Sequence, residues 1–104
     1  MIEFDWDHAN VAHLAKHRVT QEEAEQVILN RPVDLSKELR SGEERLAQIG
    51  ETDRGRVLVV ISTMVESGIR VVTAWPANKA YRSYFATLKR NDNVGRVEGQ
   101  DVRE

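Results

Sequence analysis

Three apolar stretches in the second half of the chain, separated by short polar connections, most constrain what this chain can fold into. The stretches are residues 45–50, 56–64 and 69–75, and the connections are residues 51–55 and 66–68. Short connections of polar residues and glycine between strand-like segments are typical of β-hairpins. The pattern therefore predicts three neighbouring antiparallel strands, with residues 33–39 as a further strand at the edge of the sheet.

The N-terminal region carries a strand pattern followed by a helix-start signal. Residues 2–6 alternate apolar and acidic side chains, which is the period of a half-buried strand. Asp7 is then expected to cap a short helix over about residues 8–17. In this helix Val11 and Leu14 are expected to face the core.

Thr20 and Glu23 predict the start of a second helix, because they have the spacing of a capping box. In such a box each side chain bonds the backbone N–H of the other residue. Val19 is available as the apolar staple before the box, and Pro32 is expected to stop the helix. The apolar residues that share one face of this helix are Ala24, Val27 and Ile28.

A last helix is expected to begin at Pro76, because proline suits the first helical position. Its apolar face repeats at helical spacing and consists of Tyr81, Tyr84, Phe85 and Leu88. Residues 91–104 are dominated by charged, amide and glycine residues, which cannot bury enough surface to become ordered. We expect one domain over residues 1–90 and a mobile C-terminal tail over residues 91–104.

Together these elements predict an α+β fold, in which helices cover one face of a small antiparallel β-sheet. The chain has 104 residues, enough for a single hydrophobic core. Its longest apolar run, residues 57–61, is far shorter than the roughly 20 residues that a membrane-spanning helix needs. The N-terminus is acidic, unlike a signal peptide. We therefore expect a cytoplasmic protein without a membrane association.

The charge of the chain is divided unevenly along its length. Residues 1–53 have six basic and twelve acidic side chains, whereas residues 54–90 have seven basic side chains and one acidic. A cationic half of this kind suits a polyanionic partner such as RNA. The alternative is a solvated surface on which the two halves interleave after folding.

Three arginines of the cationic half, Arg56, Arg70 and Arg82, are candidate phosphate ligands. Guanidinium groups can grip a phosphate through two parallel hydrogen bonds and stay charged at every relevant pH. We expect the three groups to meet near one end of the sheet. Strand periodicity places Arg70 and Trp75 on opposite faces of the last strand.

Aromatic residues accompany these arginines along the chain. Trp75, Tyr81 and Tyr84 could stack on unpaired bases, as aromatic side chains do in proteins that bind single strands. The alternative is that they belong to the hydrophobic core.

The histidines allow two interpretations. His13 and His17 are four residues apart and lie on one side of the first helix. Two imidazoles at this spacing can hold zinc, but the glutamate of the metalloprotease signature is missing and the chain has no cysteine. We therefore expect no metal and no cofactor. His17 follows Lys16 at the helix end, where it either caps the last carbonyls or takes part in catalysis.

Several short segments, taken together, resemble the BrnT family of toxins. They are Phe4-Asp5-Trp6-Asp7, His13, Lys16 to Thr20, Glu22 to Val27, Asn30-Arg31-Pro32, Glu44-Arg45, Ile49-Gly50, Gly55-Arg56, Val59-Val60 and Ile69 to Ala74. The resemblance spans about residues 2–89 and keeps the spacings of the family.

The resemblance implies a RelE-like fold and the role of toxin in a bacterial type II toxin–antitoxin system. It further implies an endoribonuclease that cleaves RNA without a metal, through attack of the 2′-hydroxyl, with the protein supplying a base, an acid and cations. The implied partner is a BrnA-like antitoxin with a ribbon-helix-helix DNA-binding pattern. The assembly would be a homo-oligomer or a toxin–antitoxin hetero-oligomer.

By similarity, the site residues follow from the matching positions. The catalytic residues are His17 as acid or base and Arg56, Arg70 and Arg82 as phosphate clamps, and Lys16 or Lys79 assists as an RNA-binding residue. Trp75 and Tyr81 are RNA-binding candidates because they could stack on bases, not because of the resemblance.

Three positions depart from the pattern of the family. Trp75 stands where the family usually has arginine, Tyr81 stands where it has glutamate before Arg82, and Phe85 stands where it often has tyrosine. Loss of one cation from a phosphate site can slow a reaction by about 10² to 10³-fold. The alternative function is therefore a catalytically weak or inactive protein-binding module that pairs with a small antitoxin-like partner.

Overall fold

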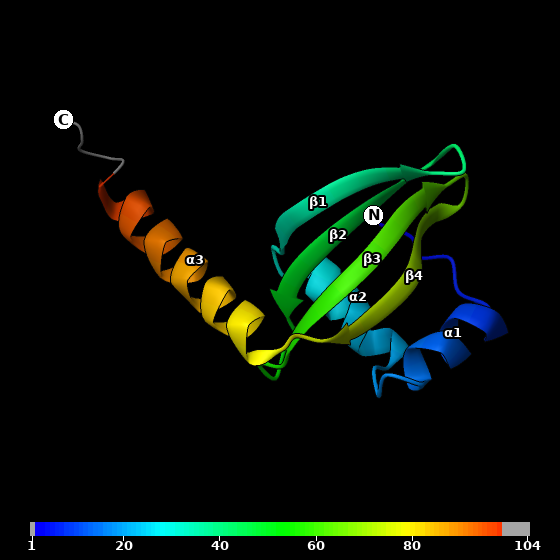
Figure 1. Ribbon diagram of the computed structural model, residues 1–104, viewed down its shortest axis with the longest axis horizontal. Coiled ribbons are helices and arrows are strands. Elements are labelled where there is room, and N and C mark those ends of the chain that lie inside the picture. The colour runs from blue at the N-terminus through cyan, green and yellow to red at the C-terminus, as the bar shows by residue number, and fades with distance from the viewer. Residues whose placement is uncertain (1, 99–104) are drawn as a thin grey trace.

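The computed structural model describes residues 2–98 and shows three helices with one four-stranded antiparallel sheet (Figure 1). In chain order the elements are α1 (His8–Ala15), α2 (Gln21–Leu29), β1 (Val33–Arg40), β2 (Glu43–Glu51), β3 (Val57–Val65), β4 (Gly68–Pro76) and α3 (Lys79–Glu98). The predicted α+β fold, with two helices before the sheet and one after it, is confirmed. Within the described residues, no helix combines the length and the apolar character needed to cross a membrane.

The sheet is a meander in the order β1-β2-β3-β4, so every strand pairs with its neighbour in sequence. The two predicted hairpins are confirmed, and the predicted edge strand is present as β1. Ser41 and Gly42 connect β1 to β2 with φ of +55° and +79°. A two-residue turn in which both residues have positive φ matches the twist of antiparallel strands.

A β-bulge changes which side chains of β4 share a face. Thr63 pairs with Arg70 and Val59 pairs with Trp75, and the register shifts between these two pairs. Thr63 and Val59 are four residues apart on β3 and therefore point to the same face of the sheet. Their partners do so as well, because the bulge adds one residue to β4. The prediction that Arg70 and Trp75 lie on opposite faces is wrong.

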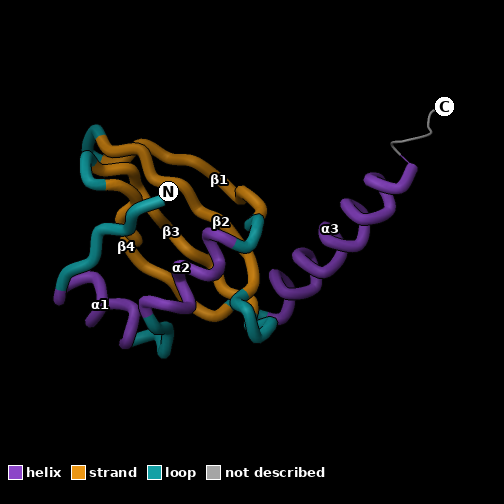
Figure 2. The backbone as a smooth tube through the Cα atoms, turned by 180° about the vertical axis from the view of Figure 1, so that it is seen from behind, coloured by secondary structure: helices purple, strands orange, loops and turns teal. Residues whose placement is uncertain are grey.

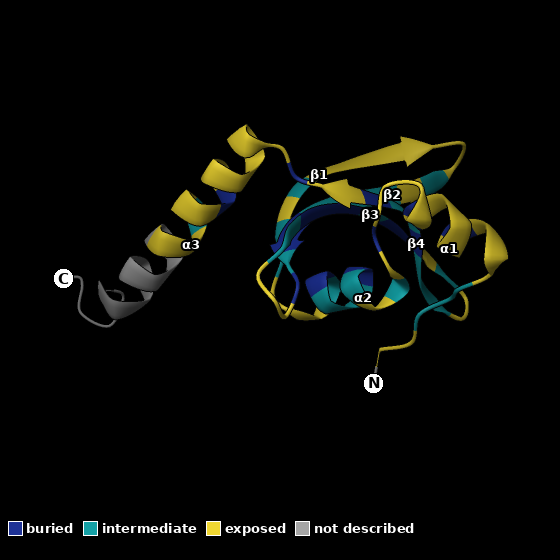
Figure 3. Cartoon of the chain, turned by 90° about the horizontal axis from the view of Figure 1, so that it is seen from below, coloured by how far each residue is buried: buried dark blue, intermediate teal, exposed yellow. Residues whose placement is uncertain are grey.

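Helices α1 and α2 cover one face of the sheet and enclose the main core between themselves and the strands (Figure 2). The buried residues of this core are Leu14, Val19, Ala24, Val27, Leu58, Val60, Val71 and Ala74. Figure 3 shows α2 lying in the curve of the sheet, with buried residues on both.

The opposite face of the sheet carries only a small cluster, made of Ile49, Val59, Ala77 and Phe85. Phe85 is the residue through which α3 packs on this cluster, and beyond it α3 projects away from the sheet (Figure 1). Much of this face is therefore covered by no helix, and we call it the open face.

Both predicted helix caps are confirmed. The Asp7 side chain accepts a hydrogen bond from the Asn10 backbone at 3.0 Å, and the Asn10 side chain accepts one from the Asp7 backbone at 2.7 Å. Thr20 and Glu23 form the second capping box with distances of 3.1 and 3.0 Å. Val19, expected as a staple, is buried.

The first helix is shorter than expected, and one of the two side chains expected to face the core is exposed. It ends at Ala15 rather than near His17. Leu14 is fully buried as predicted, but Val11 is 37% exposed, so its expected core position is wrong.

The segment before α1 is not a strand, although its residues alternate. It makes one isolated parallel bridge, between Phe4 and Ile69, supported by backbone hydrogen bonds of 2.8 and 2.9 Å on either side. Gly68 permits this close approach, because a Cβ at that position would collide with the Glu3 carbonyl. The predicted strand is therefore wrong, but the segment does lie along the edge of β4.

The last helix begins later than expected. Pro76 ends β4, and α3 starts at Lys79, so the prediction of Pro76 as the first helical residue is wrong. Phe85 is buried, whereas Tyr81 and Tyr84 are 45% and 48% exposed. The backbone of α3 continues to Glu98, and residues 99–104 lie outside the described part. The mobile tail over residues 91–104 and the domain boundary at its start stay predictions.

Candidate active site

The residues expected to form one phosphate clamp lie in different parts of the structure. Arg56 directly precedes β3, whereas Arg70 pairs with Thr63 near the other end of that strand. The seven-residue separation between positions 56 and 63 corresponds to roughly 23 Å of strand at about 3.3 Å per residue. A single phosphate cannot bridge this distance. The expected convergence of Arg56, Arg70 and Arg82 on one phosphate is therefore wrong.

Arg56 instead binds the start of α2. Its guanidinium donates to the Glu23 carboxylate at 2.8 Å. Partial burial acts to raise the pKa of Glu23, but the hydrogen bond from the Thr20 backbone and the Arg56 guanidinium outweigh it. The pKa of Glu23 therefore lies below its ordinary value of 4.5. Arg56 and Glu23 thus fix α2 against the first residues of β3.

Glu23→Gln should reduce stability in a pH-dependent way. Because the pKa of Glu23 is lowered in the folded state, the ionised carboxylate stabilises the fold above its unfolded pKa, and this contribution is lost as the pH falls through the folded pKa. We expect the variant to lose about 0.5–1 kcal/mol at neutral pH and to approach the wild type in acid. Urea unfolding across this pH range measures the difference. A difference that does not change with pH would contradict the assignment, and exposed Glu22→Gln is the matched control.

Arg82 and Lys79 lie on the first turn of α3. The Arg82 guanidinium donates to the Ala77 carbonyl at 2.9 Å. This hydrogen bond links the first turn of α3 to the segment between β4 and α3. Lys79 is exposed.

Lys16 and His17, two further residues of the predicted site, directly follow α1. Lys16 is the C-cap of α1, and the His17 backbone N–H donates to the Leu14 carbonyl at 2.9 Å. The ring of His17 meets the ring of His13 edge-on, with 5.7 Å between ring centroids. The capping of α1 is thus made by backbone groups, and both imidazoles are left exposed.

His13, rather than His17, lines a cavity that also contains Arg70. This cavity has a volume of about 510 Å³ and lies between α1 and the strands. Its polar lining includes His13, Arg45, Thr63 and Arg70. Buried Asn10 forms part of its wall and is held by hydrogen bonds from its side-chain amide to the Asp5 and Val71 carbonyls, at 3.1 and 3.2 Å. We call it the histidine–arginine cavity.

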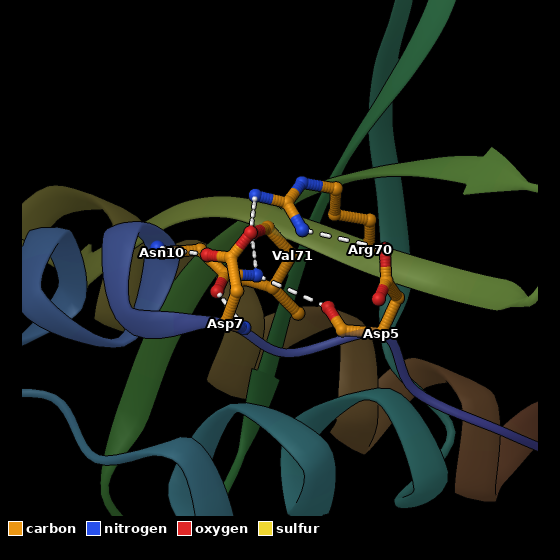
Figure 4. A network of polar contacts seen from close by, with 5 residues as sticks. All are labelled: Asp5, Asp7, Asn10, Arg70 and Val71. Carbon is orange, nitrogen blue, oxygen red and sulfur yellow. Dashed lines mark hydrogen bonds and ion pairs between the residues drawn. The ribbon is translucent and has the colours of Figure 1, made fainter.

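Arg70 is oriented by two carboxylates of the N-terminal segment (Figure 4). Its guanidinium donates to Asp7 at 3.0 Å and to Asp5 at 3.3 Å. The hydrogen bond that Arg70 donates to the Asp7 carboxylate is the main reason why the pKa of Arg70 is raised. The pKa of Asp7 is lowered, chiefly by the hydrogen bond from the Asn10 backbone and further by Arg70. Arg70 is therefore a fixed cation whose orientation depends on the cap of α1.

Arg45 is the second cation of this cavity, and sequence reasoning missed it. Arg45 pairs with Thr63 across β2 and β3, and Thr63 pairs with Arg70 across β3 and β4. Neighbouring strands are about 4.8 Å apart, so the two arginines flank Thr63 at roughly 10 Å from each other. The Arg45 Nε donates to Glu43 at 3.0 Å. Counting residue pairs back from the turns of the two hairpins gives their register. This register places Arg45, Thr63 and Arg70 in one row across the sheet.

A second cavity lies where α3 meets the open face. It has a volume of about 380 Å³, and its aromatic lining consists of Trp75, Tyr81 and Tyr84. The structure thus brings two of the predicted RNA-binding residues, Trp75 and Tyr81, to one place. Trp75 is 38% exposed, so none of the three is a core residue.

Among the described residues, no three histidine, aspartate or glutamate side chains gather in a group that could hold a metal ion. The absence of a metal and of other cofactors stays a prediction.

Fold and site together define a small α+β protein with a histidine and two arginines in one cavity beside an open antiparallel sheet, an arrangement suited to a phosphate-containing substrate. The family model of BrnT, the ribonuclease toxin of a type II toxin–antitoxin system, matches residues 6–80. The chain belongs to this family, which confirms the resemblance found in the sequence. Membership in a type II system implies an antitoxin partner. No curated protein matches the chain.

Proposed function

We propose that this protein is a toxin that cleaves RNA in the histidine–arginine cavity without a metal, by attack of a 2′-hydroxyl on the adjacent phosphate. The observation that carries this proposal is the row formed by Arg45, Thr63 and Arg70 beside His13. The nucleophile is supplied by the RNA itself. The protein therefore has to move two protons and balance charge on the phosphorus oxygens.

The side chains of the cavity fit these tasks. As a base, His13 takes the proton of the 2′-hydroxyl, whose oxygen then attacks phosphorus. The bond from phosphorus to the 5′-oxygen breaks, and that oxygen takes up a proton from an acid. His17 is our candidate for the acid, since its ring lies 5.7 Å from that of His13. Arg45 and Arg70 stabilise the charge that develops on the phosphate.

Chelation and product analysis test the reaction type. Purified protein should cleave RNA in excess EDTA at a rate within about twofold of that in magnesium, because none of the proposed steps uses a metal. The products should end in 2′,3′-cyclic phosphates, which mass spectrometry identifies. A rate that collapses in EDTA and recovers with added magnesium would contradict the proposal, as would products with 3′-hydroxyl ends.

We further propose a BrnA-like ribbon-helix-helix antitoxin as the partner, in a toxin–antitoxin hetero-oligomer, and the cytoplasm as the location because the substrate is RNA. Co-expression with the product of the neighbouring reading frame, followed by gel filtration, tests the partner.

A second candidate function is a binding module without catalytic activity. It is favoured by the carboxylates that already occupy both arginines, Asp5 and Asp7 on Arg70 and Glu43 on Arg45. A phosphate has to compete with these groups. Intact RNA at high protein concentration, together with a stable complex with the neighbouring gene product, would support this function.

A further inference from the structure

Three neighbouring cavities extend from the space between α1 and the strands across the open face. The histidine–arginine cavity shares Arg45 and Thr73 with a central cavity of about 270 Å³. The central cavity shares Ala47, Ile61 and Trp75 with the aromatic cavity beside α3. One groove therefore crosses the open face, from the proposed catalytic residues at one end to the aromatic side chains at the other.

The two ends of this groove differ in chemistry. The first end presents His13, Arg45 and Arg70. The other end presents Trp75 and Tyr81, whose side chains are 38% and 45% exposed. The bulge in β4 is what places Arg70 and Trp75 on the same face and so joins the two ends.

We propose that the aromatic end of this groove is a subsite for unpaired nucleotides, whose bases stack on Trp75 and Tyr81 while a phosphate further along the same strand occupies the histidine–arginine cavity. This inference rests on the proposed function and adds a substrate class to it, namely single-stranded RNA. The cation-rich end and the aromatic end match the two kinds of group that an RNA strand presents, its phosphates and its bases.

The groove is long enough for several nucleotides of one strand. Arg70 and Trp75 are five residues apart on β4, which includes one bulged residue, so the groove is on the order of 15 Å long. At about 3.4 Å per stacked nucleotide this length accommodates four or five nucleotides. In duplex RNA the bases are stacked on each other and paired, so their faces are not accessible to an aromatic side chain.

Binding measurements with a substrate that cannot be cleaved test the subsite. The probe is a short single-stranded 2′-O-methyl oligonucleotide without self-complementarity, compared with the same sequence annealed to its complement. Trp75→Ala should weaken binding of the single strand by about tenfold and leave binding of the duplex nearly unchanged. Trp75→Phe should restore most of the affinity, because phenylalanine keeps an aromatic face. Leu39→Ala, at an exposed apolar residue that lines none of the three cavities, is the matched control.

Tryptophan fluorescence gives a direct view of stacking. The chain has two tryptophans, Trp6 and Trp75. Trp6 is half-buried and donates to Glu25 at 2.7 Å, away from the groove residues. In the Trp6→Phe background the remaining emission comes from Trp75, and the single-stranded probe should quench it in step with binding.

The outcomes separate this inference from the proposed function. Cleavage of RNA by the wild type, with unchanged probe affinity in Trp75→Ala and no quenching, overturns the subsite and leaves the proposed function standing. A wild type that neither binds nor cleaves RNA overturns both. If Trp75→Ala weakens the complex with the antitoxin but not RNA binding, the aromatic end is a protein interface and the inference is wrong.

Discussion

Replacement of His13 by alanine should lower the rate of RNA cleavage by about 10² to 10⁴-fold, the usual contribution of a positioned acid or base. His13 lines the cavity that contains Arg45 and Arg70, whereas His17 lines none of the described cavities that we assign to the substrate. His17→Ala should therefore have the smaller effect, through the loss of the proposed proton donor. Single-turnover cleavage of a labelled RNA measures both rates.

The third histidine provides the control for this experiment. His8 is the first residue of α1, exposed, and not among the lining residues of the histidine–arginine cavity. His8→Ala should cleave RNA at the wild-type rate. If His17→Ala abolishes cleavage and His13→Ala does not, the role belongs to His17, as the family resemblance implies, and the cavity assignment is wrong.

The parts of the fold that sequence predicted well depend on local interactions. The capping box of Thr20 and Glu23 and the cap at Asp7 are made within one turn of helix, so the spacing of two residues is enough to identify them. The hairpins are likewise defined by short connections between apolar strands. The strand predicted from the alternation of residues 2–6 does not form, because this segment pairs with β4 through one isolated bridge.

The site could not be predicted in the same way, because its geometry depends on register and on one bulge. Arg56 and Arg70 are both close to strand ends in sequence, but the antiparallel pairing of β3 and β4 puts them at opposite ends of the sheet. Arg45 is far from Arg70 in sequence and two strands away in space, so only the register of both hairpins relates the two arginines. No pattern of residue types reveals the bulge that brings Arg70 and Trp75 to one face.

The uneven distribution of charge along the chain is a further case. Two arginines of the second half are paired with acidic residues of the first half. Asp5 and Asp7 bind Arg70, and Glu23 binds Arg56. The alternative of interleaved charges is thus supported for these pairs. A phosphate ligand therefore has to displace the carboxylates that already bind these arginines.

Arg70→Ala should lower the rate of cleavage by about 10² to 10³-fold, comparable to the loss of one preorganised donor to a developing oxyanion. Arg70→Lys should recover only part of this loss. An ammonium keeps the charge but cannot reproduce the planar, two-pronged contact of a guanidinium. Cleavage rates of the two variants, measured with thermal unfolding curves on the same preparations, give the comparison.

The unfolding curves matter because Arg70 also ties the N-terminal segment to β4 through Asp5 and Asp7. Asp7→Asn separates the two roles. Asparagine is as good an N-cap as aspartate, so α1 keeps its cap while Arg70 loses one carboxylate competitor. If Arg70 binds phosphate, Asp7→Asn should cleave RNA as fast as the wild type or faster, although it weakens the same anchor. Equal losses of activity in Asp7→Asn and Arg70→Ala, with equal shifts in melting temperature, would instead mean that Arg70 only anchors the segment, and the phosphate would then have to be held by Arg45.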